Sequence, residues 1–204
     1  TDQLLALVDL AKHGEMAALN SKVEDLRQRH LEFSEISSEK FRQEFVEEIN
    51  QTCADLNDLV KALGVIREVS PRSLDAVLSF GELLSSRILT AALSNAGVPA
   101  AWVDARVVLV TDDIHASATP DMVATSARVQ SEIAKRLQKK FVPVVGGFVG
   151  STHEGITTTL GRGGSDYSAA VIGACLGVSE IQIWTDVDGM LTADPRIIKS
   201  PKLV

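Results

Sequence analysis

A glycine-rich turn at residues 161–164, Gly-Arg-Gly-Gly, is the feature that most restricts how this chain can fold. Its glycines let the backbone bend freely and leave no side chains to obstruct a ligand. Residues 167–176 read as a helix, for which Ser165 or Asp166 is the predicted N-cap and Gly177 the C-terminal stop. Such a turn at a helix N-terminus presents free N–H groups and the positive end of the helix dipole, which together favour a bound anion.

A short apolar run follows this helix at residues 181–184, Ile-Gln-Ile-Trp, and predicts a buried strand. The polar residues 185–189 then form the predicted loop at its carboxyl end. Ligands of open α/β sheets bind at the carboxyl ends of the strands, so two candidate ligand loops flank one helix and one strand. The glycine spacing matches neither the dinucleotide-binding fingerprint nor a Walker A loop.

The segments before the turn alternate between helices and short apolar strands. Residues 100–103 and 107–110 read as strands, and residues 141–145 as a buried strand of the parallel type. Pro120-Asp121 begins a predicted helix whose inward side chains are Met122, Val129, Ile133 and Leu137. This alternation indicates an α/β domain with a mainly parallel sheet.

The first 70 residues read as amphipathic helices. One ends at Gly14, a second runs from Met16 to Phe33, and a third is capped by Ser37 or Ser38 and closed by Gly64. We expect residues 15–70 to be a helical addition to an α/β core at residues 71–204.

Ser70-Pro71 signals the start of another helix, which the apolar pattern continues to residue 93. Gly81 interrupts this pattern, and an interior glycine costs roughly 1 kcal/mol relative to alanine. It could break the helix and direct Glu82 into a site. The pattern alone leaves open whether Glu82 faces a site or solvent.

The composition limits the class of protein. A formal net charge of −7 argues against general binding to nucleic acid or to anionic membranes. Cys53 and Cys175 lie in apolar helical patterns, which favours reduced thiols in a cytoplasmic protein. No apolar run approaches the ~20 residues that span a bilayer.

Two motifs carry a family resemblance: TTTLGRGGSDYSAA at residues 157–170 and WTDVDGMLTADPR at residues 184–196. Together with residues 148–150 (FVG) and 79–85 (SFGELLS), they resemble the aspartate kinases of the amino acid kinase family. The resemblance covers most of the chain, weakly in the first 70 residues and strongly from Ser79 onward.

This resemblance implies a three-layer α/β/α sandwich with a mainly parallel sheet. It implies a phosphotransferase that uses ATP and Mg²⁺ to phosphorylate the β-carboxylate of L-aspartate, the first step toward lysine, threonine and methionine. It also implies a cytoplasmic protein that forms a homo-oligomer in its full-length parent, with no nucleic-acid or membrane partner.

The resemblance further assigns residues to the two substrates. Arg162 would grip the α-carboxylate of aspartate, and Glu82 and Asp166 would pair with its α-ammonium. The remaining expected contacts are Thr1, Gly163, Gly164 and Ser165 for aspartate, and Thr185, Asp186 and Arg196 for the nucleotide.

The family's K-F-G-G segment, whose lysine faces the transferred phosphate, has no counterpart in residues 1–204. The regulatory ACT domains that follow in the family have none either. We therefore expect a partial catalytic domain that forms little aspartyl phosphate by itself, and we assign no catalytic residue and no metal ligand within it.

Other functions remain open at this point. Another amino acid kinase, acting on acetylglutamate or uridylate, would need no acidic pair for a free amine. A non-catalytic nucleotide-binding module is a second alternative for this chain. A nicotinamide-dependent dehydrogenase is remote, because the expected glycine fingerprint is not present.

Overall fold

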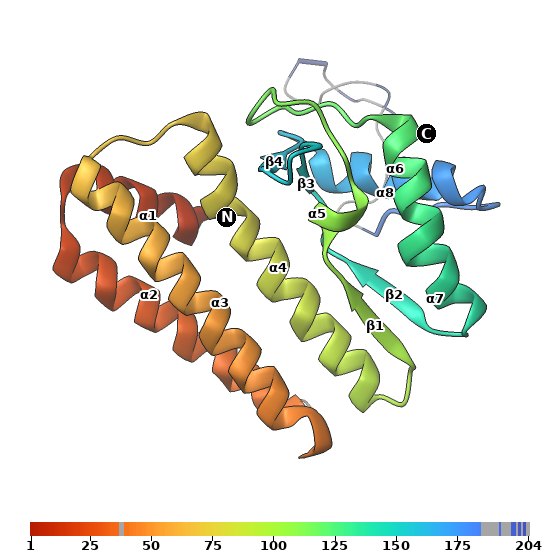
Figure 1. The fold of residues 1–204 in the computed structure, drawn as a ribbon, viewed down its shortest axis with the longest axis horizontal. Helices are drawn as coiled ribbons and strands as arrows, with labels where there is room; N and C mark the ends of the chain where they lie inside the picture. The colour runs from red at the N-terminus through yellow and green to blue at the C-terminus, as the bar shows by residue number, and fades with distance from the viewer. Residues whose placement is uncertain (37–38, 185–191, 193–196, 199, 201, 203–204) are drawn as a thin grey trace.

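The computed structural model describes residues 1–36, 39–184, 192, 197–198, 200 and 202. Two parts of the chain lie on either side of one long helix, α4 (Figure 1). Helices α1 to α3 form one part, and short strands with further helices form the other.

The first part contains α1 (Asp2–His13), α2 (Met16–Leu31), a 3₁₀ turn (Glu32–Ile36), α3 (Glu39–Ile66) and α4 (Pro71–Asn95). Gly14 ends α1 in the left-handed conformation, with φ 72°, as its position predicts. The Oγ of Ser70 accepts a hydrogen bond from the N–H of Ser73, and Pro71 opens α4. These starts and stops confirm the sequence signals at Gly14 and Ser70-Pro71. The predicted cap of α3, Ser37 or Ser38, lies outside the described residues.

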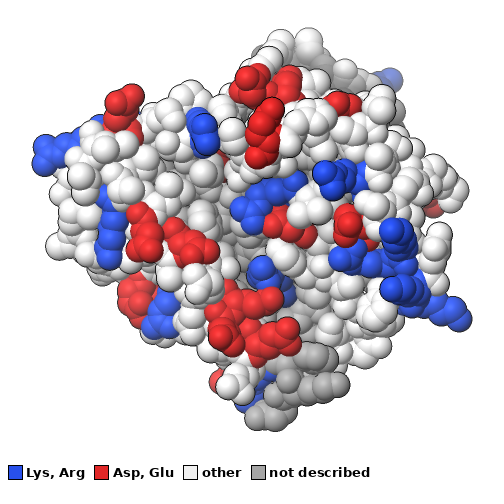
Figure 2. All heavy atoms as spheres, viewed as in Figure 1, with Lys and Arg blue, Asp and Glu red and all other residues white. Residues whose placement is uncertain are grey.

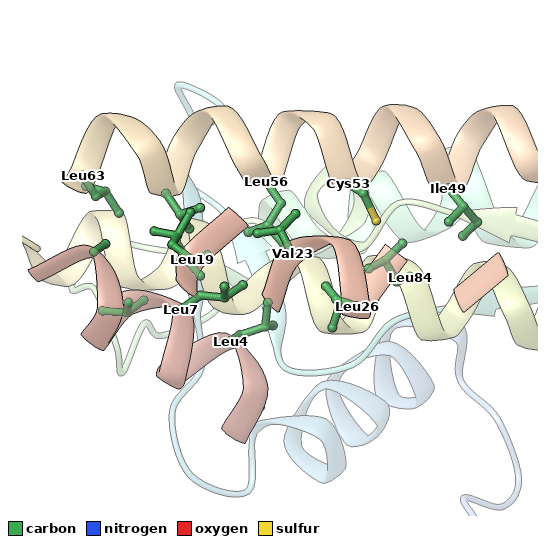
Figure 3. Packing of buried hydrophobic residues seen from close by; sticks show 14 of the residues in the cluster. Leu4, Leu7, Leu19, Val23, Leu26, Ile49, Cys53, Leu56, Leu63 and Leu84 are labelled. Atoms are coloured by element: carbon green, nitrogen blue, oxygen red, sulfur yellow. The ribbon is translucent and has the colours of Figure 1, made fainter. Parts of the chain in front are cut away.

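Apolar side chains from all four helices share one core (Figure 3). Leu7 of α1, Leu19 of α2 and Leu56 of α3 are fully buried, and Leu84 brings α4 into the same cluster. Each fully buried leucine of this kind contributes about 1.5–3 kcal/mol relative to an exposed one. Cys53 is buried in this cluster, where burial raises the pKa of its thiol to about 11.

Two glycine predictions in the helices are wrong. Gly64 lies inside α3, which continues to Ile66, and Gly81 lies inside an unbroken α4. Both allow helices to approach closely. A Cβ on Gly64 would lie 2.7 Å from the Sδ of Met16, and one on Gly81 would lie 3.2 Å from Cδ1 of Leu4.

The second part begins with β1 (Ala100–Val103), α5 (Ala105–Val108) and α6 (Met122–Val129). A π-helical turn (Gln130–Ala134) joins α6 to α7 (Lys135–Gln138). Then follow β2 (Val142–Val145), β3 (Val149–Ser151), β4 (Thr157–Thr159) and α8 (Gly164–Leu176). Strand β1 pairs in parallel with β2, with Ala100 opposite Val142, and β3 pairs antiparallel with β4, with Val149 opposite Thr159. Helix α4 lies against β1, β2 and β4, and α6 packs against α8.

The strand predicted at residues 107–110 is wrong. Asp104 caps a short helix there, because its side chain accepts a hydrogen bond from the N–H of Arg106 at 2.9 Å. Val110 keeps only an isolated parallel bridge to Ser151. A local capping side chain thus outweighs the strand preference of the valines.

Two further strand predictions need correction. Residues 181–184 form no strand, and Trp184 is 90% exposed. An extended run becomes a strand only where a neighbour takes its backbone hydrogen bonds, and no described residue pairs with this one. Residues 142–145 do form a parallel strand, but Val144 alone among them is buried. Val129 at the end of α6 and Ile133 in the π-helical turn are buried as predicted, whereas Met122 of α6 and Leu137 of α7 are exposed.

Helix α4 is, by length and composition alone, long and apolar enough to cross a membrane. The sequence reading did not predict this. Length and composition are weak evidence on their own, because core helices of soluble proteins have the same properties. Helix α4 contacts α1, α3, β1 and β4, as a packing helix does.

Charged side chains of both signs are mixed over the face shown in Figure 2. Lys and Arg gather near the end of α7, where Lys135 and Arg136 lie in its last turn.

Candidate functional site

The glycine-rich turn opens directly into α8. Gly163 adopts the left-handed conformation, with φ 73°, and is the N-cap of the helix. The predicted caps, Ser165 and Asp166, are wrong, because the left-handed residue lets the helix begin earlier and places both in its first turn. The first N–H groups of a helix lack partners within it, so this end can bind an anion.

Three segments distant in the sequence meet at this helix end. The loop after β2 passes between Glu82 of α4 and Ser165 of α8. A Cβ on Gly146 would lie 3.1 Å from the carbonyl oxygen of Glu82, and one on Gly147 would lie 2.9 Å from Cα of Ser165. On the other side of the loop, a Cβ on Gly164 would lie 2.9 Å from the Phe148 ring. Only glycines allow this close approach of backbones.

A pocket of about 260 Å³ lies between these segments. It is lined by predicted substrate residues from α4, the glycine-rich turn, α8 and the first residue of the chain. Arg162 is the exception: it does not line the pocket and its side chain is exposed beside it. The lining residues are Thr1, Glu82, Phe148, Gly161, Gly163, Gly164, Ser165 and Asp166.

Glu82 is the half-buried acid of this pocket. Burial raises the pKa of its carboxyl group above the ordinary value of 4.5. A carboxylate that has lost part of its hydration gains more from a cation than an exposed one does. Its position on an unbroken α4 answers the question that the sequence left open, because Glu82 faces a pocket.

Asp166 differs from Glu82 in its surroundings. It lies exposed in the first turn of α8, where the helix dipole favours a negative side chain. The pocket therefore combines two carboxylates with a helix N-terminus. A ligand with both an amino group and a carboxylate has complementary charges.

Sequence reasoning did not assign Phe148 or Gly161 to the site. Phe148 has a left-handed backbone, with φ 67°, and its N–H donates to the Oγ of Ser168 at 3.2 Å. A non-glycine residue in this conformation is held by its surroundings and often marks a functional site. The two glycines at 146–147, directly after a strand, were the available signal for Phe148.

The predicted nucleotide residues Thr185, Asp186 and Arg196 lie outside the described residues. Within the described part of the chain, no group of three or more His, Cys, Asp or Glu side chains gathers at a metal-binding distance. Of the predicted site residues, the described pocket brings together those expected to contact aspartate, apart from Arg162.

Comparison with known proteins places the chain in the amino acid kinase family, whose family model matches residues 11–204. The chain belongs to this family, and the predicted α/β fold class is confirmed by its structural neighbours. Among relatives, it is 34% identical over its whole length to lysine-sensitive aspartokinase 3 of Escherichia coli, covering 44% of that protein. It is 42% identical over 153 residues to chloroplastic aspartokinase 1 of Arabidopsis thaliana, covering 71% of the chain and 26% of the relative.

Comparison with solved structures also finds aspartokinases. The crystal structure of E. coli aspartokinase III with aspartate and ADP matches 99% of the chain and 44% of that protein, with a TM-score of 0.83. The structure of the same enzyme with lysine and aspartate gives a TM-score of 0.81 at the same coverage. The chain thus spans less than half the length of these relatives.

Proposed function

We propose that the protein containing this chain is an aspartate kinase. An oxygen of the β-carboxylate of L-aspartate attacks the γ-phosphorus of ATP, and the bond between that phosphorus and the ADP oxygen breaks. The products are 4-phospho-L-aspartate and ADP. An aspartate β-carboxylate has a pKa of about 3.9 and is ionised at neutral pH, so the reaction needs no general base. Catalysis then depends on positioning and on cations that offset charge in the transition state.

The observation that carries the proposal is the mixed charge of the pocket. Glu82 and Asp166 both line the pocket, which supports their proposed contact with the α-ammonium group of a free amino acid. The N-terminus of α8 and the adjacent Arg162 attract its α-carboxylate. A substrate with a blocked amine would leave the half-buried Glu82 without a partner, which is costly. The names of the relatives support the same substrate, because both E. coli structures contain aspartate.

On the nucleotide side, Thr185, Asp186 and Arg196 remain our proposed contacts. Mg²⁺ would be held mainly by the ATP phosphates, as is usual where a protein offers few carboxylates. When bound, the ion would neutralise charge on the phosphates. The cytoplasmic location, the homo-oligomer and the division of the chain at residue 70 also remain predictions.

The test is aspartyl phosphate formation by the full-length protein, trapped with hydroxylamine as the hydroxamate. We expect product from L-aspartate with Mg²⁺ and ATP, and none from N-acetylaspartate, which keeps the β-carboxylate but lacks the ammonium group. N-acetylglutamate and UMP test the other members of the family. Turnover of N-acetylaspartate equal to that of aspartate, or turnover of UMP alone, would contradict the proposal.

The substitution Arg162→Lys tests the carboxylate contact, because lysine keeps the charge but loses the planar, two-pronged donor. Loss of a charge-assisted hydrogen bond of this kind predicts a KM for aspartate raised by about 10- to 100-fold. The KM for ATP should change by less than about twofold, on the same reasoning. Arg128→Lys on the exposed surface of α6 is the control, and should leave both constants unchanged. Equal increases in both constants would place Arg162 elsewhere.

A further inference from the structure

Asp75 is a fully buried carboxylate on α4, two helical turns before Glu82. Its hydrogen-bond partners among the described residues do not line the pocket, and the proposed reaction does not use it. A buried charge is costly unless it is fully hydrogen-bonded, so its retention needs a reason.

Donors from two other segments satisfy this carboxylate. The Nδ1 of His115 donates to Oδ2 of Asp75 at 2.7 Å. The backbone N–H of Ala116 is shared between the two carboxylate oxygens at 3.1 Å each, and the Oγ1 of Thr159 donates to Oδ1 at 2.6 Å. The N–H of Ala116 and the hydroxyl group of Thr159 are donors, and Nδ1 of His115 donates in the tautomer that carries a hydrogen there.

One of these segments continues into the glycine-rich turn, and the other packs against it. Thr159 ends β4, two residues before Gly161, and its carbonyl oxygen accepts from the N–H of Ala118 at 2.9 Å. Ala116 has a left-handed backbone, with φ 67°. Its carbonyl oxygen lies against Gly161, where an added Cβ would approach to 2.7 Å.

Asp75 therefore fixes both Thr159, two residues before the turn, and the loop on which the turn rests. We infer that Asp75 is a positioning residue: by holding Thr159 and the 115–116 loop, it sets the 161–164 turn at the distance from Glu82 that the substrate requires. Because Asp75 and Glu82 lie on the same rigid helix, α4 determines both walls of the pocket. The substrate named here is aspartate, and in that respect the inference rests on the proposed function.

Substitutions can separate this role from simple stability. Asp75→Asn keeps the shape of the side chain but replaces one acceptor oxygen with an N–H₂ group. This group then faces the hydrogen-bond donors that surround Asp75. Thr159→Val removes the hydroxyl group at nearly constant volume, and Thr159→Ser restores it. Ser79→Ala is the matched control, because Ser79 is also buried on α4 but its hydroxyl donates only to the local carbonyl of Ala76.

The first readout is kinetic and uses the full-length protein. Asp75→Asn and Thr159→Val should each raise the KM for aspartate by about tenfold or more, the cost of losing a hydrogen bond to a charged group. Their KM for ATP should stay within about twofold of the wild type. Thr159→Ser should recover the wild-type KM, and Ser79→Ala should leave it unchanged.

The second readout needs no substrate. Hydrogen exchange of the peptide covering residues 160–165 should be about tenfold faster in Asp75→Asn and Thr159→Val, and unchanged in Ser79→Ala. If Asp75→Asn does not fold, the comparison of Thr159→Val with Thr159→Ser still tests the positioning role. Unchanged exchange in Thr159→Val, or a KM for aspartate no higher than that of Ser79→Ala, would overturn the positioning role. Absence of aspartyl phosphate from the wild type would instead overturn the proposed function, and the exchange result would still decide the role of Asp75.

Discussion

At the scale of single residues, Glu82 shows how burial and function oppose each other. Its carboxyl group lies half-buried at the edge of the pocket, and burial raises its pKa. The charged form is therefore held in the folded state at a cost in stability. The same loss of hydration strengthens its attraction for an ammonium group. Sites that bind ligands commonly accept such a cost.

Glu82→Gln should consequently improve stability while weakening binding. Because folding raises the pKa of Glu82, the protonated carboxyl group contributes its full stability below about pH 4.5, the pKa of this group in the unfolded chain. It is lost as pH rises through the raised pKa. The variant should melt at a higher temperature than the wild type near neutral pH, and this difference should shrink as the pH is lowered. Its KM for aspartate should rise by about 10- to 100-fold.

Calorimetry from about pH 4 to pH 8, together with steady-state kinetics, checks both parts. Glu47→Gln, at an exposed position on α3, is the control and should show neither effect. A variant that melts below the wild type at neutral pH would show that Glu82 is stabilised by a partner in the fold.

At the scale of elements, glycines decide which segments can touch. The 2.9 Å approach at Gly147 is to backbone Cα of Ser165, which cannot move without moving α8. The 2.7 Å approach at Gly64 is to the Sδ of Met16, near the end of a flexible side chain that can rotate away. The same substitution should therefore have opposite effects at the two positions.

We predict that Gly64→Ala raises the free energy of unfolding by up to about 1 kcal/mol, the helix-propensity gain in an interior turn. Gly147→Ala should lower it by about 1–3 kcal/mol, as overpacking does, and should also raise the KM for aspartate. Urea unfolding of both variants against the wild type measures the two changes. If Gly147→Ala leaves both quantities unchanged, the loop after β2 does not fix the position of α8.

The elements that could be predicted from the sequence are those whose signals are local. Helix ends at Gly14, Pro71 and Gly177 follow from backbone conformation and capping within a few residues. The strand predictions at 107–110 and 181–184 are wrong. An apolar run becomes a strand only beside a partner strand, and the local sequence does not show whether such a partner is present. The site divides in the same way. Residues 163–166 are contiguous, so the sequence could suggest them together, whereas Phe148 and Asp75 lie near them only through tertiary contacts.

At the scale of the whole molecule, one residue of α4 connects the two parts. The Arg87 guanidinium lies 3.7 Å from the centroid of the Trp102 ring in β1, and its NH1 group pairs with Oε2 of Glu48 in α3 at 2.6 Å. Trp102 in turn donates from Nε1 to the Oγ of Ser86, which donates to the carbonyl oxygen of Glu82. This cluster links α3, α4 and β1 to the backbone of a pocket residue.

Arg87→Ala should lower the free energy of unfolding by about 1–2 kcal/mol, mostly through the lost stacking on Trp102, since partly exposed ion pairs contribute little. Arg87→Lys should recover less than half of this loss, because lysine lacks the planar group. Salt screens the ion pair but not the stacking contact. Denaturant unfolding at low and high salt measures both contributions, and a loss that disappears entirely at high salt would assign the effect to Glu48 alone.

The position of α4 between the two parts of the chain has a consequence for the order of folding. The buried residues of the helical core all lie between Leu4 and Leu84, whereas β1 pairs with residues 142–145, and segments made first during synthesis generally fold first. Helix α4 would then be in place, with Asp75 and Glu82 already spaced, before residues 115, 147, 159 and 165 reach it. The pocket would be completed last during folding. Because the pocket is lined from both parts of the chain, partial unfolding that separates them would abolish ligand binding while the helical core remains intact.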